Sequence, residues 1–127
     1  ACELVRQKSP LYLEKIALLR NLLESSLKKI FGKRIIILGE NVDRLINTSG
    51  VMLKDVDADM LFLKCNTIAF SSGSACNSGS ITTSHIVKSI LPEEQGNTFL
   101  RFSLLETTTS DDIKRLLNTI MEVIQHG

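Results

Sequence analysis

The chain has no tryptophan and only two prolines, and aromatic residues make up 5% of its 127 residues. It also lacks a charge bias, because fifteen basic residues stand against fourteen acidic ones and leave a net charge of +1. Since no block of like charge occurs, we expect no nucleic-acid ligand. No apolar run approaches the roughly 20 residues of a membrane-spanning helix, and the first residues lack the basic-then-apolar pattern of a secretory signal. These absences favour a cytoplasmic protein that contacts neither membrane nor nucleic acid.

Cysteine is scarce as well: Cys2, Cys65 and Cys76 make an odd count without a C-x-x-C pair. This pattern argues against a zinc cluster or other metal site and against a disulfide framework, and it fits a reducing compartment. With 43% hydrophobic residues, a chain of this length can bury one modest core, so residues 1–127 are expected to form a single domain. The chain opens at Ala1 rather than at methionine, which we interpret as a processed piece, a cleaved tag or a fragment.

Apolar residues at helical spacing predict a long helix that starts at Ser9-Pro10, with serine as cap and proline in the first turn. Gly32 stands where a left-handed cap would end it. The apolar face recurs every three or four positions, at Tyr12, Ile16, Leu19, Leu23, Leu27 and Ile30. This face indicates core packing rather than function.

Shorter runs predict the remaining elements. Strands are expected at 34–38, at 47–53, at 67–70 and at 98–104, and the strand 47–53 is weakened by Gly50. In the last strand Leu100, Phe102 and Leu104 share one face, so Arg101 points to the other. Short helices are expected up to Cys65 and from Thr82 or Thr83 to Pro92. Thr109 with Asp112 resembles a capping box for a final helix, whose apolar stripe is Ile113, Leu116, Leu117, Ile120 and Ile124.

The segment 71–78, SSGSACNS, is a run of serine and glycine that closes on Cys76. Such residues fill no core and leave the backbone loose, so the thiol is presented to another molecule rather than packed away. Cys76 is therefore a candidate nucleophile. The alternative is a free cysteine that acts as a small hydrophobic residue.

The loop motif does not stand alone. It is followed by a short predicted helix, by the strand 99–104 (FLRFSL), and by 107–113 (TTTSDDI). Together these segments resemble the C-terminal part of cysteine desulfurases, pyridoxal-phosphate enzymes of the class V aminotransferase-like family, in the group with a long SSGSAC loop. Residues 44–48 look like the beginning of a small-domain strand, so the resemblance covers nearly the whole chain. It implies an α+β fold, a small and mostly antiparallel sheet of three to four strands with helices packed on it. It also implies that the large cofactor-binding domain is absent.

The resemblance further implies the chemistry. Cys76 matches the thiol that takes sulfur from L-cysteine, giving L-alanine and a persulfide on the enzyme. Arg101 matches the arginine that binds the substrate carboxylate through two parallel hydrogen bonds; the alternative is a surface or interstrand ion pair. Cys2, Cys65 and His85 receive no role, and the serines of the loop are explained equally well by its flexibility.

No cofactor lysine, pyridine-binding aspartate or phosphate cup of the family occurs in this chain. We therefore expect pyridoxal phosphate only in a full-length parent and none on this chain alone, which is expected to be inactive. The resemblance implies a homodimeric parent whose persulfide passes to an acceptor such as an iron–sulfur scaffold or a transfer-RNA thiolation protein. The alternative is a standalone, non-catalytic persulfide carrier or protein-interaction module.

Overall fold

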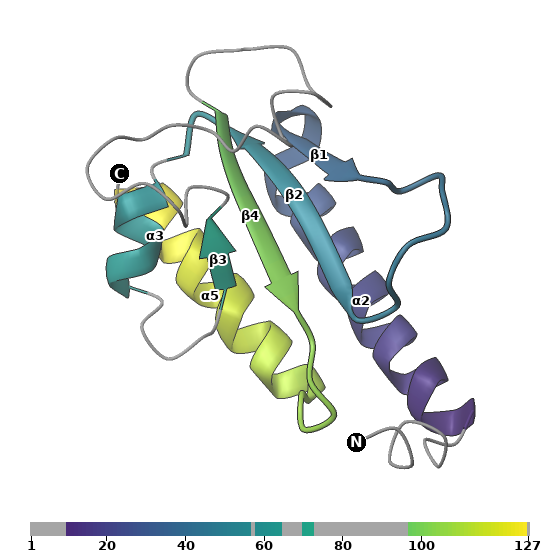
Figure 1. The fold of residues 1–127 in the computed structure, drawn as a ribbon. Helices are drawn as coiled ribbons and strands as arrows, with labels where there is room; N and C mark the ends of the chain where they lie inside the picture. The colour runs from purple at the N-terminus through teal and green to yellow at the C-terminus, as the bar shows by residue number, and fades with distance from the viewer. Residues whose placement is uncertain (1–9, 57, 65–69, 73–96, 127) are drawn as a thin grey trace.

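A computed structural model describes residues 10–56, 58–64, 70–72 and 97–126 (Figure 1). The predicted helix that ends at Pro92 lies outside these residues. The elements follow in the order α2 (Pro10–Phe31), the 3-10 turn η1 (Gly32–Arg34), β1 (Ile35–Leu38), β2 (Thr48–Lys54), α3 (Ala58–Lys64), β3 (Phe70–Ser72), β4 (Asn97–Ser103) and α5 (Ser110–His126).

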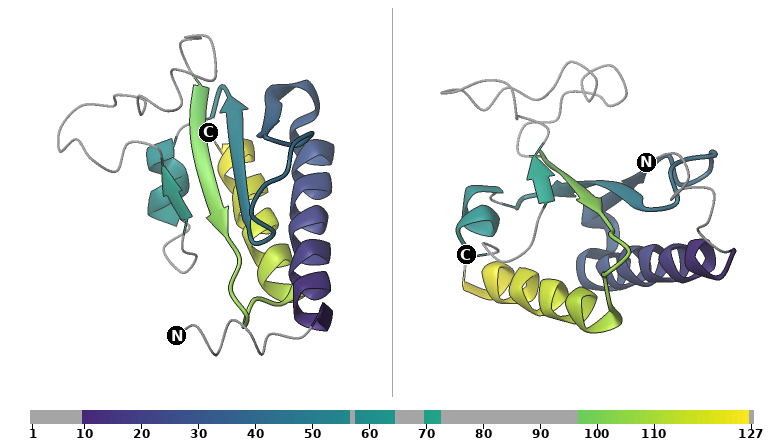
Figure 2. Two further views of the ribbon diagram at one scale, coloured as in Figure 1. Left: turned by 45° about the vertical axis from the view of Figure 1, so that its right-hand side comes forward. Right: turned by 60° about the horizontal axis from the view of Figure 1, so that its bottom comes forward.

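The strands form one four-stranded sheet in the order β1-β2-β4-β3, and every neighbouring pair is antiparallel. The helices α2 and α5 lie side by side on one face of this sheet, which gives two layers (Figure 2). The opposite face, called the outer face below, is turned away from both helices. The predicted α+β fold with a small antiparallel sheet is thereby confirmed.

Local sequence explains the long helix. The stripe Ile16, Leu19, Leu23 and Leu27 is buried against the sheet, as the helical spacing predicts. The helix ends at Phe31, and Gly32 adopts a left-handed φ of 56°, a conformation that glycine reaches without a side-chain clash.

The final helix has the predicted cap. The backbone N–H and the hydroxyl of Thr109 both donate to Asp112 Oδ2 at 2.8 Å, and the Asp112 N–H donates back to Thr109 Oγ1 at 3.3 Å. These bonds from Thr109 hold the pKa of Asp112 below its ordinary value. The cap fixes where α5 begins, and its apolar stripe then packs on the core with Ile113, Leu116 and Ile120.

The predicted strand 67–70 lies mostly outside the described residues. Of that range the structure describes Phe70, which belongs to β3, Phe70–Ser72. Its position is set by pairing, because Phe70 lies opposite Phe102 and Ser72 opposite Leu100. Serine has a weak preference for strands, and the ladder with β4 outweighs that local preference.

Candidate functional site

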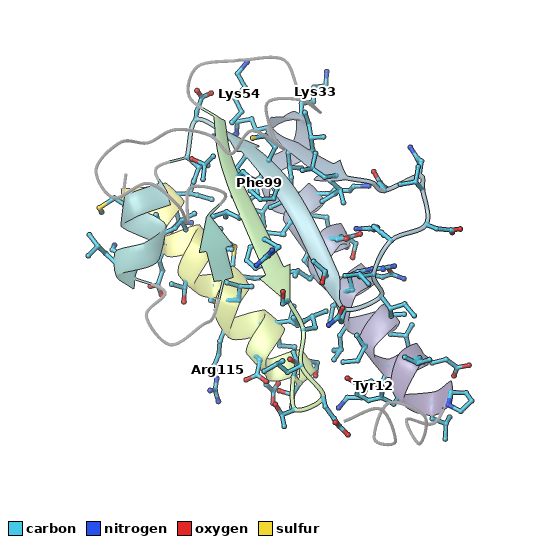
Figure 3. The ribbon with its side chains drawn as sticks, in the orientation of Figure 1. Tyr12, Lys33, Lys54, Phe99 and Arg115 are labelled. Atoms are coloured by element: carbon cyan, nitrogen blue, oxygen red, sulfur yellow. The ribbon has the colours of Figure 1, made fainter. Side chains whose placement is uncertain are left out.

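Arg101 stands on the outer face of the sheet. Its neighbours Leu100 and Phe102 are buried toward the helices, whereas Arg101 is exposed. This is the orientation that strand alternation predicts. Phe99, two positions earlier on the same strand, shares this face and is labelled in Figure 3.

The register leaves Arg101 without an acidic neighbour directly across the sheet. Gly50 on β2 and Ser71 on β3 are the residues opposite it. Among the described residues, ion pairs join Lys28 to Glu40, Arg44 to Glu24 and Lys114 to Asp111. A directly opposed interstrand ion pair, the alternative explanation for Arg101, has no carboxylate at either position. The carboxylate-binding role of Arg101 stays a prediction, and the register gives no directly opposed partner that would replace it.

The strand next to Arg101 leads into the serine-rich segment. β3 is one of the two edge strands of the sheet, and it ends at Ser72, four positions before Cys76. Cys76 lies outside the described residues, as do Cys65 and His85, so its role as nucleophile stays a prediction. The strand that precedes the Cys76 segment in the sequence, β3, nevertheless pairs with the strand that carries Arg101. The sequence alone did not establish this pairing.

A glycine and an aromatic ring lie beside Arg101. A Cβ atom added to Gly50 would meet the ring carbons Cε2 and Cζ of Phe99 at 3.3 and 3.5 Å, and Leu38 Cβ at 3.6 Å. The Phe99 ring thus leans from β4 toward β2 and occupies the space over Gly50. Such packing of a ring onto a cross-strand glycine compensates for the missing side chain of glycine in a strand.

A buried ionic cluster secures the loop that leads into β2. Arg44 donates from Nη1 and Nη2 to the two carboxylate oxygens of Glu24 at 2.6 and 2.8 Å, and Ser49 Oγ donates to Glu24 Oε1 at 2.7 Å. Arg20 Nη1 donates to the carbonyl oxygen of Leu45 at 3.2 Å. The loop between β1 and β2 is therefore attached to α2 at two successive residues.

The charges in this cluster shift each other's protonation. Burial by itself raises the pKa of Glu24, but the hydrogen bonds from Arg44 and Ser49 and the charges of Arg44 and Arg20 outweigh burial and lower it. The hydrogen bond to Glu24 raises the pKa of Arg44. Sequence reasoning missed this cluster. The signal available was a carboxylate beside Leu23 at the margin of the apolar stripe, which favours a buried partner.

A hollow of about 510 Å³ lies elsewhere, between the end of β4 and the first turns of α5. Its lining includes Leu104, Leu105, Thr108, Ile113 and Arg115, and it does not include Arg101. The hollow therefore does not belong to the arginine site on the outer face.

The residues directly opposite Arg101 include no lysine that could bind pyridoxal phosphate. A site for this cofactor needs a lysine for the cofactor aldehyde and hydroxyl or backbone donors for the phosphate. The positions across from Arg101 are Gly50 and Ser71, and Lys54, the lysine on β2, pairs with Asn97 at the far end of β4. In this same part of the chain, no group of three or more His, Cys, Asp or Glu could hold a metal ion. No helix of the described part is long and apolar enough to cross a bilayer.

No family model matches the chain. Individual relatives do: it is 32% identical to a cysteine desulfurase of Rhodobacter capsulatus over 98% of this chain and 33% of the relative. It is 37% identical to a cysteine desulfurase of Sinorhizobium fredii over 72% of this chain and 24% of the relative. It is 30% identical to the cysteine desulfurase NifS of Azotobacter vinelandii over 84% of this chain and 27% of the relative. The chain thus spans about a third or less of the length of these relatives.

Solved structures agree. A NifS-like protein from Rickettsia africae superposes with a TM-score of 0.71 at 28% identity, over 89% of this chain and 29% of that protein. A second NifS-like protein shows the same fold. It superposes with a TM-score of 0.70 at 19% identity, over 91% of this chain and 28% of that protein. The relatives and the fold agree with the motifs on β4 and in the segment 71–78. Over the third or less of their length that it spans, the chain belongs to the cysteine desulfurase family.

Proposed function

We propose that residues 1–127 are the small domain of a cysteine desulfurase and supply two groups to its reaction: Arg101 to bind the carboxylate of L-cysteine, and Cys76 to accept its sulfur. The observation that supports this proposal is the placement of Arg101. It is exposed on the outer face, has no directly opposed carboxylate, and lies beside the strand that leads to Cys76. An arginine fork makes two parallel, charge-assisted hydrogen bonds to a carboxylate, so it fixes both position and orientation.

In the proposed sulfur transfer, one S–S bond forms and one C–S bond breaks. The sulfur of Cys76 attacks as a thiolate and forms an S–S bond with the substrate sulfur, while the substrate C–S bond breaks. The electron pair of that bond stays with carbon, which takes up a proton, and the products are L-alanine and a persulfide on Cys76. A thiol on a segment of small residues suits this step, because the same sulfur must approach the substrate and later reach an acceptor.

The cofactor belongs to the rest of the protein. Pyridoxal phosphate, bound there, supplies the electron sink that weakens the C–S bond. We assign no cofactor-binding residue to this chain, so the contribution proposed for Arg101 is to bind and orient the substrate. We also propose that the longer protein is a cytoplasmic homodimer, and that an acceptor such as an iron–sulfur scaffold takes the persulfide sulfur.

A fusion tests this function. The remaining part of the Rhodobacter capsulatus relative, joined ahead of this chain, should show the absorbance band of protein-bound pyridoxal phosphate and release alanine from L-cysteine. The isolated 127 residues should show neither. A fusion that carries the cofactor band and yet releases no alanine would contradict the proposal.

The same experiment separates the alternative. A standalone persulfide carrier or interaction module has no need of a cofactor domain, so the fusion should not gain turnover from this chain. To separate the two, the fusion is compared with the same Rhodobacter capsulatus part lacking any small domain. Equal alanine release by both proteins favours the carrier.

A further inference from the structure

The Phe99–Gly50 pair has a geometric consequence for Arg101. Gly50 lies directly opposite Arg101 in the β2–β4 register. The Cβ atoms of directly opposed residues in an antiparallel pair are about 4.5–5.5 Å apart. The ring carbons of Phe99 lie 3.3 and 3.5 Å from the Cβ position of Gly50. The edge of the ring therefore lies next to the base of the Arg101 side chain, on its β2 side.

The two sides of Arg101 differ for this reason. On the β2 side, the ring fills the space over Gly50. On the β3 side, the register neighbour is Ser71, which precedes Cys76 by five positions in the sequence. An exposed arginine otherwise samples many rotamers, and ordering them on binding costs free energy. The Phe99 ring on the β2 side excludes the Arg101 rotamers that extend toward β2.

We propose that Phe99, seated over Gly50, is a positioning residue that directs the Arg101 guanidinium toward β3, the strand that precedes Cys76 in the sequence. This inference rests on the proposed function, because orientation toward β3 matters only if Arg101 holds a carboxylate within reach of Cys76. Gly50 is needed for this arrangement, because a side chain at position 50 would take the space that the Phe99 ring occupies.

The distances predict a graded effect of substitutions at position 50. An alanine Cβ would sit 3.3 Å from Cε2 of Phe99 and 3.6 Å from Leu38 Cβ, so the ring must move by a few tenths of an ångström. A valine adds two methyl groups to that position and cannot coexist with the ring in its present place. Gly50→Val should therefore displace the ring, whereas Gly50→Ala shifts it slightly.

The first test is made on this chain alone and does not depend on turnover. Nitrogen-15 relaxation of the Arg101 Nε–Hε group reports how ordered its side chain is. We expect restricted motion in the native chain and in Phe99→Tyr, and faster motion in Phe99→Leu and Phe99→Ala. Ile36→Ala is the matched control. Ile36 is 51% exposed on β1 and pairs with Met52 on the outer face, two strands from Arg101.

The second test is made in the fusion. Phe99→Ala should raise KM for L-cysteine about fivefold to tenfold, the scale expected when one long side chain must be ordered anew on binding. Phe99→Tyr should keep the native KM, and the cofactor absorbance band should remain unchanged in every variant. Ile36→Ala should keep the native KM.

A double substitution separates positioning from general destabilisation. Gly50→Val and Phe99→Ala act on the same space, so their effects on KM should not add. In the double variant the valine occupies the place of the ring and should recover part of the loss. Purely additive effects would overturn the proposal.

The outcomes distinguish this inference from the function on which it rests. If Arg101→Lys leaves KM of the fusion unchanged, the carboxylate role of Arg101 fails and the positioning proposal fails with it. If Arg101→Lys raises KM but Phe99→Ala does not, the function stands and the positioning role is overturned. Equal Arg101 side-chain mobility in the native chain and in Phe99→Ala would likewise overturn it.

Discussion

Arg101 on β4 lies directly opposite Ser71 on β3, and Ser71 precedes Cys76 by five positions. The residue proposed to bind the substrate carboxylate thus lies on β4. The segment proposed to take the substrate's sulfur follows the neighbouring strand, β3, in the sequence. This arrangement fits a reaction in which one small molecule is held at its carboxylate and attacked at its sulfur. Five predictions test the residues named above.

Replacement of Arg101 by lysine should weaken substrate binding. Lysine keeps the charge but is a point donor, so it cannot reproduce two parallel hydrogen bonds. We expect KM for L-cysteine in the fusion to rise about 10-fold to 100-fold, the range for losing a hydrogen bond to a charged group. The control is Arg115→Lys, at an exposed position on α5. Steady-state alanine release measures both, and a native KM in Arg101→Lys would remove the carboxylate role.

Replacement of Cys76 by serine should abolish sulfur transfer in the fusion. Serine has nearly the same shape, but its hydroxyl is not ionised at neutral pH and cannot form a persulfide. The cofactor absorbance should persist, because no cofactor-binding group changes. Cys2→Ser serves as the control and should keep native turnover. Unchanged alanine release in Cys76→Ser would exclude this thiol from the reaction.

Replacement of Glu24 by alanine should destabilise the domain. It leaves the Arg44 guanidinium, whose side chain is only 17% exposed, without its carboxylate. We expect a loss of about 2–4 kcal/mol in the free energy of unfolding, measured with urea. Glu14→Ala changes an exposed glutamate of the same helix and should cost little.

The same pair predicts a pH dependence. The pKa of Glu24 is lowered in the folded protein, so its stabilising contribution is complete above the unfolded pKa and is lost as the pH falls through the folded pKa. The difference in unfolding free energy between the native chain and Glu24→Gln should therefore be largest near neutral pH and shrink below about pH 4. A difference that is constant from pH 7 to about pH 3 would show that the charge of Glu24 is not what stabilises the loop.

Replacement of Thr109 by alanine should weaken the start of α5. The hydroxyl of Thr109 accepts from the Asp112 N–H and donates to the Asp112 carboxylate. Loss of such a cap lowers the melting temperature by about 3–6 °C in a domain of this size. Thr107→Ala, at an exposed position outside the cap, should leave it unchanged. Calorimetry of the three chains measures the effect.

The local features of this fold could be predicted from the sequence. The apolar stripe of α2, the turn at Gly32 and the Thr109–Asp112 cap each depend on residues within a few positions of one another. The side of β4 on which Arg101 stands follows from alternation along one strand. The family resemblance supplied the chemical roles of Arg101 and Cys76, which no spacing in the chain establishes.

The contacts that link distant segments could not be predicted. Glu24 and Arg44 are 20 positions apart, and their bond depends on the path of the β1–β2 loop along α2. The placement of Gly50 and Ser71 on the two sides of Arg101 depends on the strand order β1-β2-β4-β3 and on the register of each pair. A shift of one residue in either register would have placed other side chains there.

The central claim is that this chain supplies the sulfur-accepting thiol of a cysteine desulfurase. The most direct measurement is the mass of the peptide that contains Cys76, recovered without reductant after the fusion has been incubated with L-cysteine. We expect a gain of one sulfur atom on that peptide, absent from Cys76→Ser and absent without L-cysteine. Alanine release with no added sulfur on Cys76, before any acceptor is supplied, would contradict it.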